Sequence, residues 1–473
     1  MVNAIGSQGQ NAHTLTIEGL DGLVEKGHLQ AHIRPALNAK LIHRTAYEDE
    51  PCTHGEGQVF TVTKEGDLPP EQDATPPPAQ TYGAIGLDAG LTPVQPGYER
   101  YDIVMHPHRD TIDHRLSNSK VTNLNKIKSK MRILAKRVSR TLNLAYRRPL
   151  TIASKFGHAY VLADDSSGGI VTAQISNLGG FHKSWVAGNE TPVSPSNPVR
   201  ATILHNSDVI VIDVTAVTIG SRDDKSDLTP GTITFTVVSI NGVPGGTIAA
   251  LSEGDPVIAK QASVLTRPNG KSSSWALDED DTLKWNDIVN QAANMLSNGV
   301  EGDAATDKIL VYGDYFGWAA LMKDPDFQRI YRDRYANDEF VGGAEIQVQH
   351  LRMVFGHDMA KDERSDGSRV RSIVFCGQGA GTRAVYTGAD PRGGDDIQED
   401  VYLNVGPQYN TMFDPDTQVK TVIRKPIDRG GDVVSVYMEA IIGTAAQPDT
   451  LTGDWCENPD AAYKRLGSIE FIG

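Results

Sequence analysis

Three histidines and two aspartates lie close together in the sequence and are the residues best suited to metal chemistry. They fall within one short segment: His106, His108, Asp110, Asp113 and His114. Imidazole nitrogens suit zinc or nickel, and carboxylates can join such a ligand set. The segment alternates like a strand of a projecting arm, and no second group of ligands accompanies it. A chance cluster is therefore the favoured interpretation, and we expect no metal site.

A glycine-rich segment, GQGAGT at residues 377–382, follows an apolar run and has some features of a dinucleotide-binding loop. Such a loop requires the pattern G-x-G-x-x-G, because the backbone must approach a pyrophosphate at the start of a helix. Here Thr382 occupies the position of the last glycine, and Tyr386-Thr387-Gly388 interrupts the helix that should follow. The pattern favours a glycine-rich turn over a nucleotide site.

The remaining candidates for catalysis are an acidic segment and a cysteine. The carboxylates at 395–400 (Asp395, Asp396, Glu399 and Asp400) could do acid–base work if burial separated their pKa values, but in a polar, glycine-rich segment they are expected to be solvated. Cys376 ends an apolar run without a basic neighbour to favour a thiolate, so we expect it to be inert. The sequence has no HExxH, P-loop or GxSxG motif. We therefore expect neither catalytic residues nor a cofactor.

Charge is distributed unevenly along the chain. The 473 residues include 45 Lys+Arg and 60 Asp+Glu, a formal net charge of −15, yet residues 116–163 contain no acidic residue. Such a segment typically faces a polyanion or an acidic neighbour, although a solvated helix face is the simpler alternative. The basic residues that could face nucleic acid or a neighbouring chain are Lys120, Lys126, Lys128, Lys130, Arg132, Lys136, Arg137, Arg140, Arg147 and Arg148.

The same segment predicts a long helix. Apolar residues recur every three or four positions from Val121 to Ala145, which is the period of an α-helix with one buried face. Asn118 or Ser119 can cap the start of the helix, and Pro149 is expected to end it. The basic residues mostly occupy the other faces, so this helix is the element that must position them.

The residues before the helix predict a long two-stranded arm. A strand is expected at Val59–Thr63 and a returning strand at YERYDIVMHPHRDTIDHR, on either side of a proline-rich stretch at 68–80 that excludes helix and central strand. An arm of this kind has too few core positions to be stable alone, so its partner is expected to be another chain. The prolines expected to form an inter-subunit loop are Pro69, Pro70, Pro76, Pro77 and Pro78.

The rest of the chain combines a β-rich block with mixed structure. In residues 164–275, Ile233, Phe235 and Val237 alternate with threonines, and similar short runs predict a small all-β barrel or sandwich. Residues 276–473 return to alternating helices and strands. The expected elements are helices at 278–296, 315–322 and 327–335 and strands at 308–314, 344–356, 372–377 and 432–446.

In the order of these elements the chain resembles the major capsid proteins of tailed bacteriophages, which have the Hong Kong 97-like fold. That family runs from an N-terminal arm through an extended loop and a long spine helix to peripheral and axial domains. The resemblance is one of order and pattern, and it covers most of the chain except residues 164–275. The segments that carry it are the arm at 1–50, the loop at 51–113, the spine helix at 117–148, LKWNDIVNQAANML, KILVYGDYFGWAALMKDPDFQ, EFVGGAEIQVQHLRMVFG and SIVFCGQGAGTRAVY.

The resemblance implies an α+β protein with the Hong Kong 97-like capsid fold: an N-terminal arm, an extended β-hairpin loop, a long spine helix, peripheral and axial domains, and an all-β insertion domain. It places the divisions as follows: arm at 1–50, extended loop at 51–115, spine helix and start of the peripheral domain at 116–163, β-rich insertion domain at 164–275, and axial domain with the remaining peripheral-domain strands at 276–473.

The resemblance also implies a function. Copies of the chain would form hexamers and pentamers that close into the icosahedral shell around the double-stranded DNA genome of a tailed phage. The implied location is the virion, assembled in the host bacterial cytoplasm. Further implied partners are a scaffolding protein, a decoration protein and the portal, and the packaged DNA would be contacted without sequence specificity. Neither enzymatic activity nor contact with a membrane is expected.

Two other functions remain open at this point. A different virion or shell protein, such as a tail, decoration or encapsulin-like subunit, would share self-association. An enzyme with a divergent nucleotide-binding domain at residues 300–390 would instead bind a nucleotide or a metal as a purified protein. Electron microscopy distinguishes the first alternative from a capsid, because shells and tubes differ in shape, and a binding measurement tests the second.

Overall fold

The computed structural model of the chain describes residues 42–52, 59–65, 98–115, 124–164, 171–186, 189–221, 226–246, 248, 250–302, 307–335, 345–348, 350–356, 361–364, 368–386, 408–414, 419–424, 433–448 and 460–472. Several predicted features lie outside the described residues: most of the N-terminal arm, the proline-rich loop, the cap candidates Asn118 and Ser119, Lys120, and the acidic segment at 395–400. The described residues form two compact units. The first is drawn from Met1–Phe60, Asp102–Pro149 and Gly381–Ala445, and the second from Thr61–Tyr101, Leu150–Ala380 and Ala446–Gly473.

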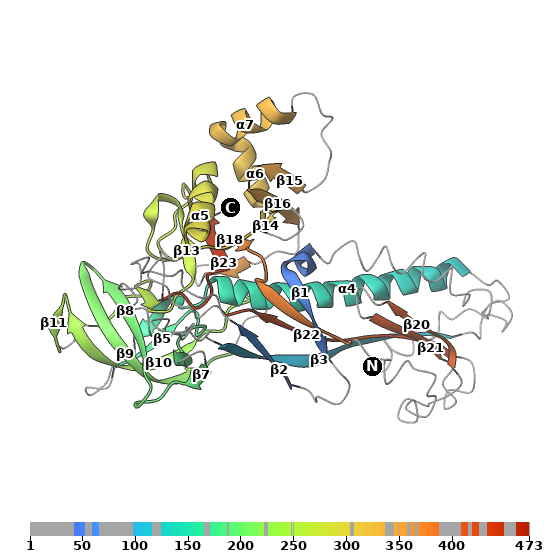
Figure 1. Ribbon diagram of the computed structural model, residues 1–473, viewed down its shortest axis with the longest axis horizontal. Helices are drawn as coiled ribbons and strands as arrows, with labels where there is room; N and C mark the ends of the chain where they lie inside the picture. Colours follow the sequence, from blue (N-terminus) through green and yellow to red (C-terminus); the bar gives the residue numbers. More distant parts are fainter. Residues whose placement is uncertain are drawn as a thin grey trace, which may run out of the picture. The chain divides into compact units, whose positions relative to one another are not determined.

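One β-sheet forms the centre of the first unit (Figure 1). After the short helix η1 (Ile42–Ala46), its strands follow the order β1 (Tyr47–Cys52), β19 (Gly381–Tyr386), β22 (Val433–Ala446), β21 (Val419–Arg424) and β20 (Gln408–Asp414). β1 and β19 run parallel in a register that sets Asp49 opposite Arg383. The buried guanidinium of Arg383 donates two hydrogen bonds of 2.7 Å to the Asp49 carboxylate, which ties the two strands together.

The returning strand of the predicted arm is β3 (Tyr98–Arg115), in which Tyr101, Ile103 and Met105 are buried and alternate with exposed residues. β3 pairs with β2 (Val59–Glu65), which confirms the two-stranded pairing. From Met105 to Arg115 it also pairs antiparallel with β22. The expectation that the arm finds its partner only on another chain is therefore wrong for this part of β3, because a strand edge pairs with any strand in reach and β22 of the same chain supplies one.

The long helix is α4 (Leu124–Ser154), drawn in teal in Figure 1. Its 31 residues span about 46 Å. The prediction that Pro149 ends the helix is wrong, since Pro149 lies inside it. Proline has no N–H to donate to the carbonyl four residues earlier, which here belongs to Ala145. The Thr444 hydroxyl donates a hydrogen bond to that carbonyl instead, at 3.0 Å. A donor from a distant strand thus replaces the missing helical one.

Thr444→Val is expected to lower the free energy of unfolding by about 1 kcal/mol, because the carbonyl of Ala145 then loses its replacement donor. Urea unfolding of the purified chain measures this. In a Pro149→Ala background the helix supplies its own N–H, so the same substitution should cost clearly less. The matched control is Thr141→Val, whose hydroxyl bonds the Arg137 carbonyl within the regular helix. If Thr444→Val lowers the free energy of unfolding equally in the wild type and in the Pro149→Ala background, the proposed role of Thr444 is contradicted.

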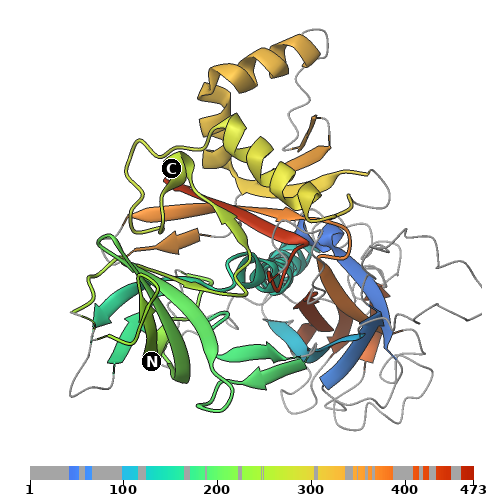
Figure 2. The same cartoon turned by 60° about the vertical axis from the view of Figure 1, so that its left-hand side comes forward.

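A closed β-barrel forms one part of the second unit, drawn in green in Figure 2. Neighbouring strands pair antiparallel around a complete ring, with β9 and β10 closing it. The ring consists of β4 (His158–Asp164), β5 (Val171–Ile175), β10 (Gly231–Ile240), β9 (Asp208–Ile219), β8 (Val199–His205) and β12 (Pro256–Ala259). The predicted all-β block is thus a barrel. It begins with β4, before the expected boundary at residue 164.

The interior of the barrel is filled by the side chains that point inward from each strand. Ile203, Ile212, Val214, Ile233 and Phe235 are buried within one apolar cluster, and their neighbours along the strands face outward. This is the period of two that the threonine-rich run at 231–240 predicts. Two short strand elements accompany the barrel: the pair β6 (Lys183–Val186) and β7 (Asn189–Pro192), and β11 (Val243–Pro244) beside β10.

A mixed sheet forms the other part of the second unit. Its order is β13 (Val264–Thr266), β23 (Leu466–Ile472), β18 (Arg369–Cys376), β14 (Ile309–Asp314), β16 (Leu351–Gly356) and β15 (Glu345–Val348), with β17 (Lys361–Glu363) beside β18. The predicted strands at 308–314 and 372–377 are confirmed as β14 and β18. The single strand predicted at 344–356 is wrong in detail, because a turn at His350 divides it into the antiparallel pair β15 and β16.

Three helices accompany this sheet: α5 (Trp285–Ser297), α6 (Tyr315–Lys323) and α7 (Pro325–Tyr335), after the short helix η2 (Pro268–Gly270). They confirm that three helices lie here, but the predicted start at residue 278 is wrong: α5 begins at Trp285, and the carboxylates at 278–281 precede the helix. Ile288, Met295, Leu321 and Phe327 bury their side chains in one apolar cluster with the strands. Asp324, between α6 and α7, accepts a hydrogen bond of 2.5 Å from the Trp285 backbone and so ties α5 to the α6–α7 corner.

Candidate functional site

The exposed face of α4 carries the described part of the predicted basic cluster. Lys136, Arg137 and Arg140 are exposed and lie on one face, since Arg140 is four positions after Lys136 and three after Arg137. Ile133 lies on the same face and is 58% exposed, which is unusual for a large apolar side chain. The opposite face is buried, as the apolar period predicts. We call Ile133, Lys136, Arg137 and Arg140 the basic stripe.

Arg137 is held by a carboxylate of the first unit. Its Nε lies 3.0 Å from Oδ2 of Asp110 on β3, although 75% of the Arg137 side chain is exposed. Asp110 belongs to the predicted histidine–aspartate cluster, so this carboxylate makes an ion pair there. His106 and His108 lie two residues apart on β3, and burial together with nearby His106 lowers the pKa of His108. Among the described residues, no group of three potential metal ligands comes together.

The other predicted basic residues are placed differently. Arg147 is only 6% exposed, so the prediction that it faces nucleic acid or a neighbour does not fit this residue. Its position four residues after the buried Asn143 and three residues before the buried Leu150 explains the burial. Arg148 is half-buried. Lys126, Lys128, Lys130 and Arg132 lie in α4, but their side chains are outside the described structure.

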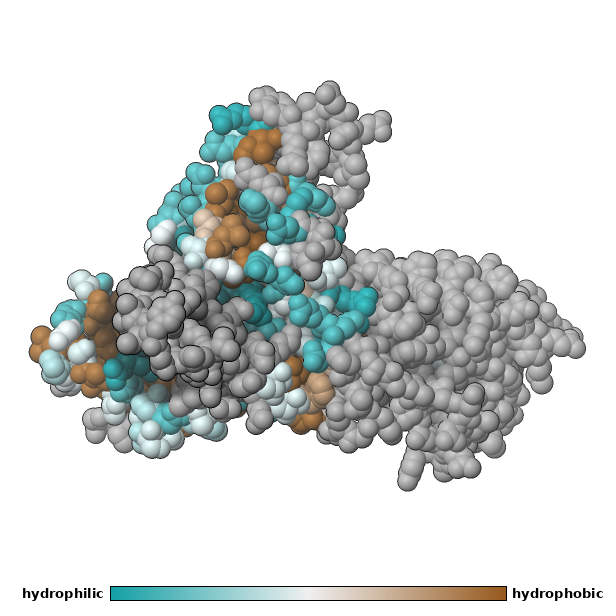
Figure 3. Space-filling model, in the orientation of Figure 1, coloured by the Kyte–Doolittle hydropathy of each residue, from teal (hydrophilic) through white to brown (hydrophobic). Residues whose placement is uncertain are grey.

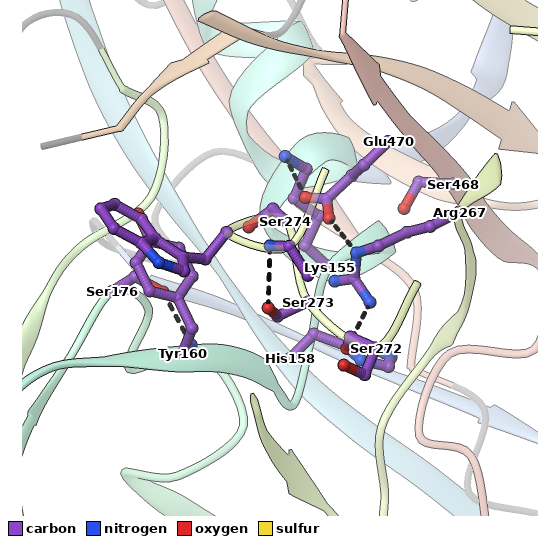
Figure 4. Close-up of polar contacts among 12 residues, drawn as sticks. Lys155, His158, Tyr160, Ser176, Arg267, Ser272, Ser273, Ser274, Ser468 and Glu470 are labelled. Carbon is purple, nitrogen blue, oxygen red and sulfur yellow. Dashed lines mark hydrogen bonds and ion pairs between the residues drawn. The ribbon is translucent and has the colours of Figure 1, made fainter. Parts of the chain in front are cut away.

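A buried cluster of charges lies directly after α4 (Figure 4). The Nζ of Lys155 lies 2.7 Å from Oε1 of Glu470, and the Nε of Arg267 lies 2.8 Å from Oε2 of the same carboxylate. The side chains of all three are at most 8% exposed. The ring of His158 contacts the carbonyl of Ser263, with 2.7 Å between Nε2 and that oxygen. We call Lys155, His158, Arg267 and Glu470 the buried charge cluster.

The two cations determine the charge state of Glu470. Burial alone would raise the pKa of its carboxyl group, but Lys155 and Arg267, by their charges and their hydrogen bonds, lower it to about 2. Burial, and next the charge of Arg267, lower the pKa of His158 to about 4. At neutral pH the cluster therefore contains two cations, one anion and a neutral imidazole. Each ion has a partner, as burial of charge requires.

Sequence reasoning missed this cluster. Lys155 lies in the segment 116–163 without acidic residues, directly after the last turn of α4. Its partner Glu470 is 315 positions away along the chain. One signal was present in the sequence: Glu470 lies between Ile469 and Phe471 in a strand that is otherwise apolar or small. A lone carboxylate in a buried strand requires a buried cation, but nothing in the sequence says which one.

A second surface feature lies at the start of α6. Tyr315 and Phe316 are 50% and 55% exposed. The guanidinium of Arg371 lies 3.6 Å from the centre of the Phe316 ring and forms an ion pair with Asp314. Asp314 also accepts a hydrogen bond of 2.8 Å from the Gly317 backbone, which caps the helix. Phe316 is thus held in place with much of its surface in solvent.

Two further apolar side chains are exposed on α5: Val289 and Leu296 are 38% and 43% exposed and lie seven residues apart. Figure 3 shows brown, hydrophobic atoms among the helices of this part of the second unit. Rigid aromatic and aliphatic side chains of this kind are typical of the central part of protein–protein contacts. We call Val289, Leu296, Tyr315 and Phe316 the apolar helix surface.

Two of the weak enzymatic signals of the sequence, GQGAGT and Cys376, lie in described residues. GQGAGT joins β18 to β19, so a strand follows this loop where a dinucleotide site requires a helix. Cys376 is fully buried, and burial raises the pKa of its thiol, which suits the inert role expected for it. Among the described helices, none is both long and apolar enough to cross a membrane.

No protein-family model matches the chain, and no curated protein matches its sequence. Several solved structures are similar to it. The capsid of Ralstonia phage GP4 is 9% identical, with a TM-score of 0.45, and the match covers 90% of this chain and 87% of that one. The capsid of cyanophage Pam1 is 7% identical, with a TM-score of 0.42, covering 91% of this chain and 92% of that one.

The capsid of a native GTA particle is 10% identical, with a TM-score of 0.38, and the match covers 92% of both chains. The head of Helicobacter pylori bacteriophage KHP40 is 8% identical, with a TM-score of 0.35, covering 90% of this chain and 86% of that one. These neighbours are capsids and a phage head, the class of protein that the sequence resembles.

Proposed function

We propose that the chain is the major capsid protein of a tailed phage and self-assembles into the icosahedral shell around double-stranded DNA. One observation carries this proposal: the 18-residue strand β3 with its partner β2, then the 31-residue helix α4, then a β-rich part and a mixed sheet with helices, follow one another along the chain. That is the order expected for an extended loop, a spine helix, an insertion domain and an axial domain. The role is structural rather than enzymatic.

In this proposal the mixed sheet with α5, α6 and α7 is the axial domain, and the sheet of the first unit with α4 is the peripheral domain. The barrel is the insertion domain. The apolar helix surface supports contact between copies, because exposed aromatic side chains gain most when a neighbour covers them. The loop with Pro69, Pro70, Pro76, Pro77 and Pro78 would lie over an adjacent subunit.

Hexamers and pentamers of the chain would then close into the shell of a virion that is assembled in the host cytoplasm. Each subunit has several neighbours in such a shell, so contacts that are weak individually give a stable particle. A scaffolding protein, a decoration protein and the portal are further partners in the proposal. The basic stripe would contact DNA phosphates or an acidic neighbour, and phosphate contacts weaken steeply with salt and do not depend on base sequence.

The test of the proposed function is expression of the chain, alone and together with the genes adjacent to its own, followed by electron microscopy of the lysate. Closed particles of uniform diameter are the expected result. Tubes would instead indicate a tail protein. A monomer that stays monomeric at high concentration with all partners present, and that binds a nucleotide, would overturn the proposal in favour of an enzyme.

Replacing Lys136, Arg137 and Arg140 together by Gln is expected to leave the subunit folded but to weaken genome retention or assembly severalfold, because three exposed cations are lost from one face. Particle yield and packaged DNA measure the effect at two salt concentrations. The control removes equal charge elsewhere, by replacing Lys260, Lys271 and Lys323 by Gln. If both triple variants assemble and retain DNA like the wild type, the basic stripe is a solvated helix face.

A further inference from the structure

The imidazole of His158 has one satisfied nitrogen and one buried nitrogen without a partner. Nε2 lies 2.7 Å from the carbonyl oxygen of Ser263, so Nε2 carries the proton and donates it to that oxygen. Part of His158 reaches the surface, but Nδ1 is buried, and no described group lies within hydrogen-bond distance of it. A second proton on Nδ1 would therefore be a buried donor without an acceptor, which destabilises the fold.

The charges that face this ring make the same proton unfavourable. Arg267 and Lys155 are cations, and Glu470 is the single anion that faces the ring. Both oxygens of Glu470 are already occupied, one by Lys155 and the other by Arg267. Protonated His158 would raise the net charge of the buried cluster from +1 to +2 without a new anion. Repulsion between buried cations is strong because water does not screen it.

The cluster lies where the elements of the second unit are joined. Lys155 directly follows α4, His158 begins the barrel strand β4, Arg267 lies between β13 and η2, and Glu470 lies on β23 of the mixed sheet. Hydroxyl groups reinforce this joint: Ser263 Oγ and Ser468 Oγ donate hydrogen bonds of 2.7 and 3.0 Å to the carbonyl of Ser154, the last residue of α4. Figure 4 shows Lys155, Arg267 and Glu470 meeting from separate elements, with His158 and Ser468 close by.

We propose that the buried charge cluster is an acid-sensitive latch: a proton on His158 adds a third cation to Lys155 and Arg267 and loosens the joint between the helix end, the barrel and the mixed sheet. The geometry at Nδ1 and the surplus of cations carry this inference. It concerns the single subunit and stands whether or not the chain forms a shell. If the proposed function holds, moderate acid weakens each subunit of the particle at the same joint.

The direction of the pH dependence follows from linkage. The pKa of His158 is about 4 in the fold, against 6.5 for an exposed histidine, so the unfolded chain takes up the proton first as the pH falls. Stability from this residue is complete above pH 6.5 and is lost as the pH falls from 6.5 to 4. Between pH 7 and 4.5 the ratio of folded to unfolded subunit should decrease about fiftyfold through His158 alone.

The experiment compares the wild type with His158→Gln in urea unfolding of the subunit from pH 7 to 4.5. The side-chain amide of Gln can still donate to the Ser263 carbonyl but does not titrate. Between pH 7 and 4.5, the ratio of folded to unfolded subunit should therefore fall about fiftyfold less in this variant than in the wild type. The matched control is His182→Gln, which alters another histidine of the second unit whose ring nitrogen also contacts a carbonyl, at 3.0 Å to Leu178. In His182→Gln the ratio of folded to unfolded subunit should fall between pH 7 and 4.5 as much as it does in the wild type.

A spectroscopic measurement keeps the test decisive if His158→Gln fails to fold. In wild-type subunit with ¹⁵N-labelled histidine, the His158 ring should remain neutral with the proton on Nε2 at pH 5.5. Equal decreases in stability for the wild type and His158→Gln would overturn the latch. A His158 ring that titrates near pH 6.5 in the folded subunit would overturn it independently, and neither result depends on whether particles form.

Discussion

Glu470→Gln is expected to lower the free energy of unfolding of the subunit by about 3–5 kcal/mol, the typical effect of breaking a buried ion pair. The substitution preserves shape but removes the only anion between Lys155 and Arg267, whose side chains are 2% and 8% exposed. Two buried cations then remain without a counter-charge. Urea unfolding at pH 7 measures the loss.

The matched control is an exposed ion pair in which both oxygens of a carboxylate likewise accept from cationic nitrogen donors. Arg200 Nε and Nη2 each lie 2.9 Å from a carboxylate oxygen of Asp213 on the barrel, and 53% of the Arg200 side chain is exposed. Asp213→Asn should cost less than about 1 kcal/mol, because solvent screens such pairs. If Glu470→Gln lowers the free energy of unfolding no more than Asp213→Asn does, the charges of the buried charge cluster contribute nothing to stability.

Acid should reproduce part of the Glu470 effect in the wild type. The pKa of this carboxyl is about 2 in the fold and 4.5 in the unfolded chain. The stability that it contributes is therefore complete above pH 4.5 and is lost as the pH falls from 4.5 to 2, by about 3 kcal/mol in total. This range lies below that of His158. Unfolding measured from pH 7 to 2 should show two successive losses, and Glu470→Gln should abolish only the lower one.

Gly180→Ala is expected to have the second largest effect, lowering the free energy of unfolding by about 1–3 kcal/mol beyond the cost of the left-handed backbone itself. Gly180 has φ +94°, and a Cβ there would lie 2.4 Å from the backbone nitrogen of Gly157. That nitrogen donates a hydrogen bond of 2.7 Å to the carbonyl of Gly179, so two backbone segments are in direct contact at the turn after α4. Neither segment can yield without breaking this bond, and overpacking of this kind costs about 1–3 kcal/mol or more.

Gly242→Ala is the control for the backbone cost. Gly242 also has positive φ, +78°, but nothing lies within 4 Å of an added Cβ. Its substitution should cost only the strain of the left-handed region, about 1–2 kcal/mol. Thermal unfolding of both variants separates the two contributions. Equal losses at the two positions would mean that the contact of Gly180 with Gly157 contributes nothing.

Features set by local periodicity were predictable from the sequence. The spacing of Leu134, Val138 and Leu142 predicts α4 and its buried face, and the alternation in 231–240 predicts a barrel strand. Both signals arise from residues that are close in sequence and share one face. The basic stripe was predictable for the same reason, since the exposed face is the remainder of the helix once its buried face is known.

Features set by distant partners were not predictable. Pro149 seemed to end the helix because its missing N–H is visible in the sequence, whereas the replacement donor, Thr444, is 299 positions from Ala145. The burial of Lys155 could not be predicted, because no residue near it in the sequence identifies Glu470 as its partner. The partner of β3 was assigned to another chain because β22 lies more than 300 positions away. Each error concerns a polar group whose partner only the tertiary fold supplies.

Closure of the barrel has a consequence for crowding. The edge strands of an open sheet have unpaired backbone N–H and C=O groups that can pair with a strand of another chain. At high concentration, identical chains with such edges can therefore polymerise edge to edge. In the ring from β4 to β12 every strand already has two neighbours, because β9 and β10 pair with each other. The barrel therefore offers no unpaired strand edge to another copy of the chain, and in the proposed shell the contacts between copies would come from side chains elsewhere on the molecule.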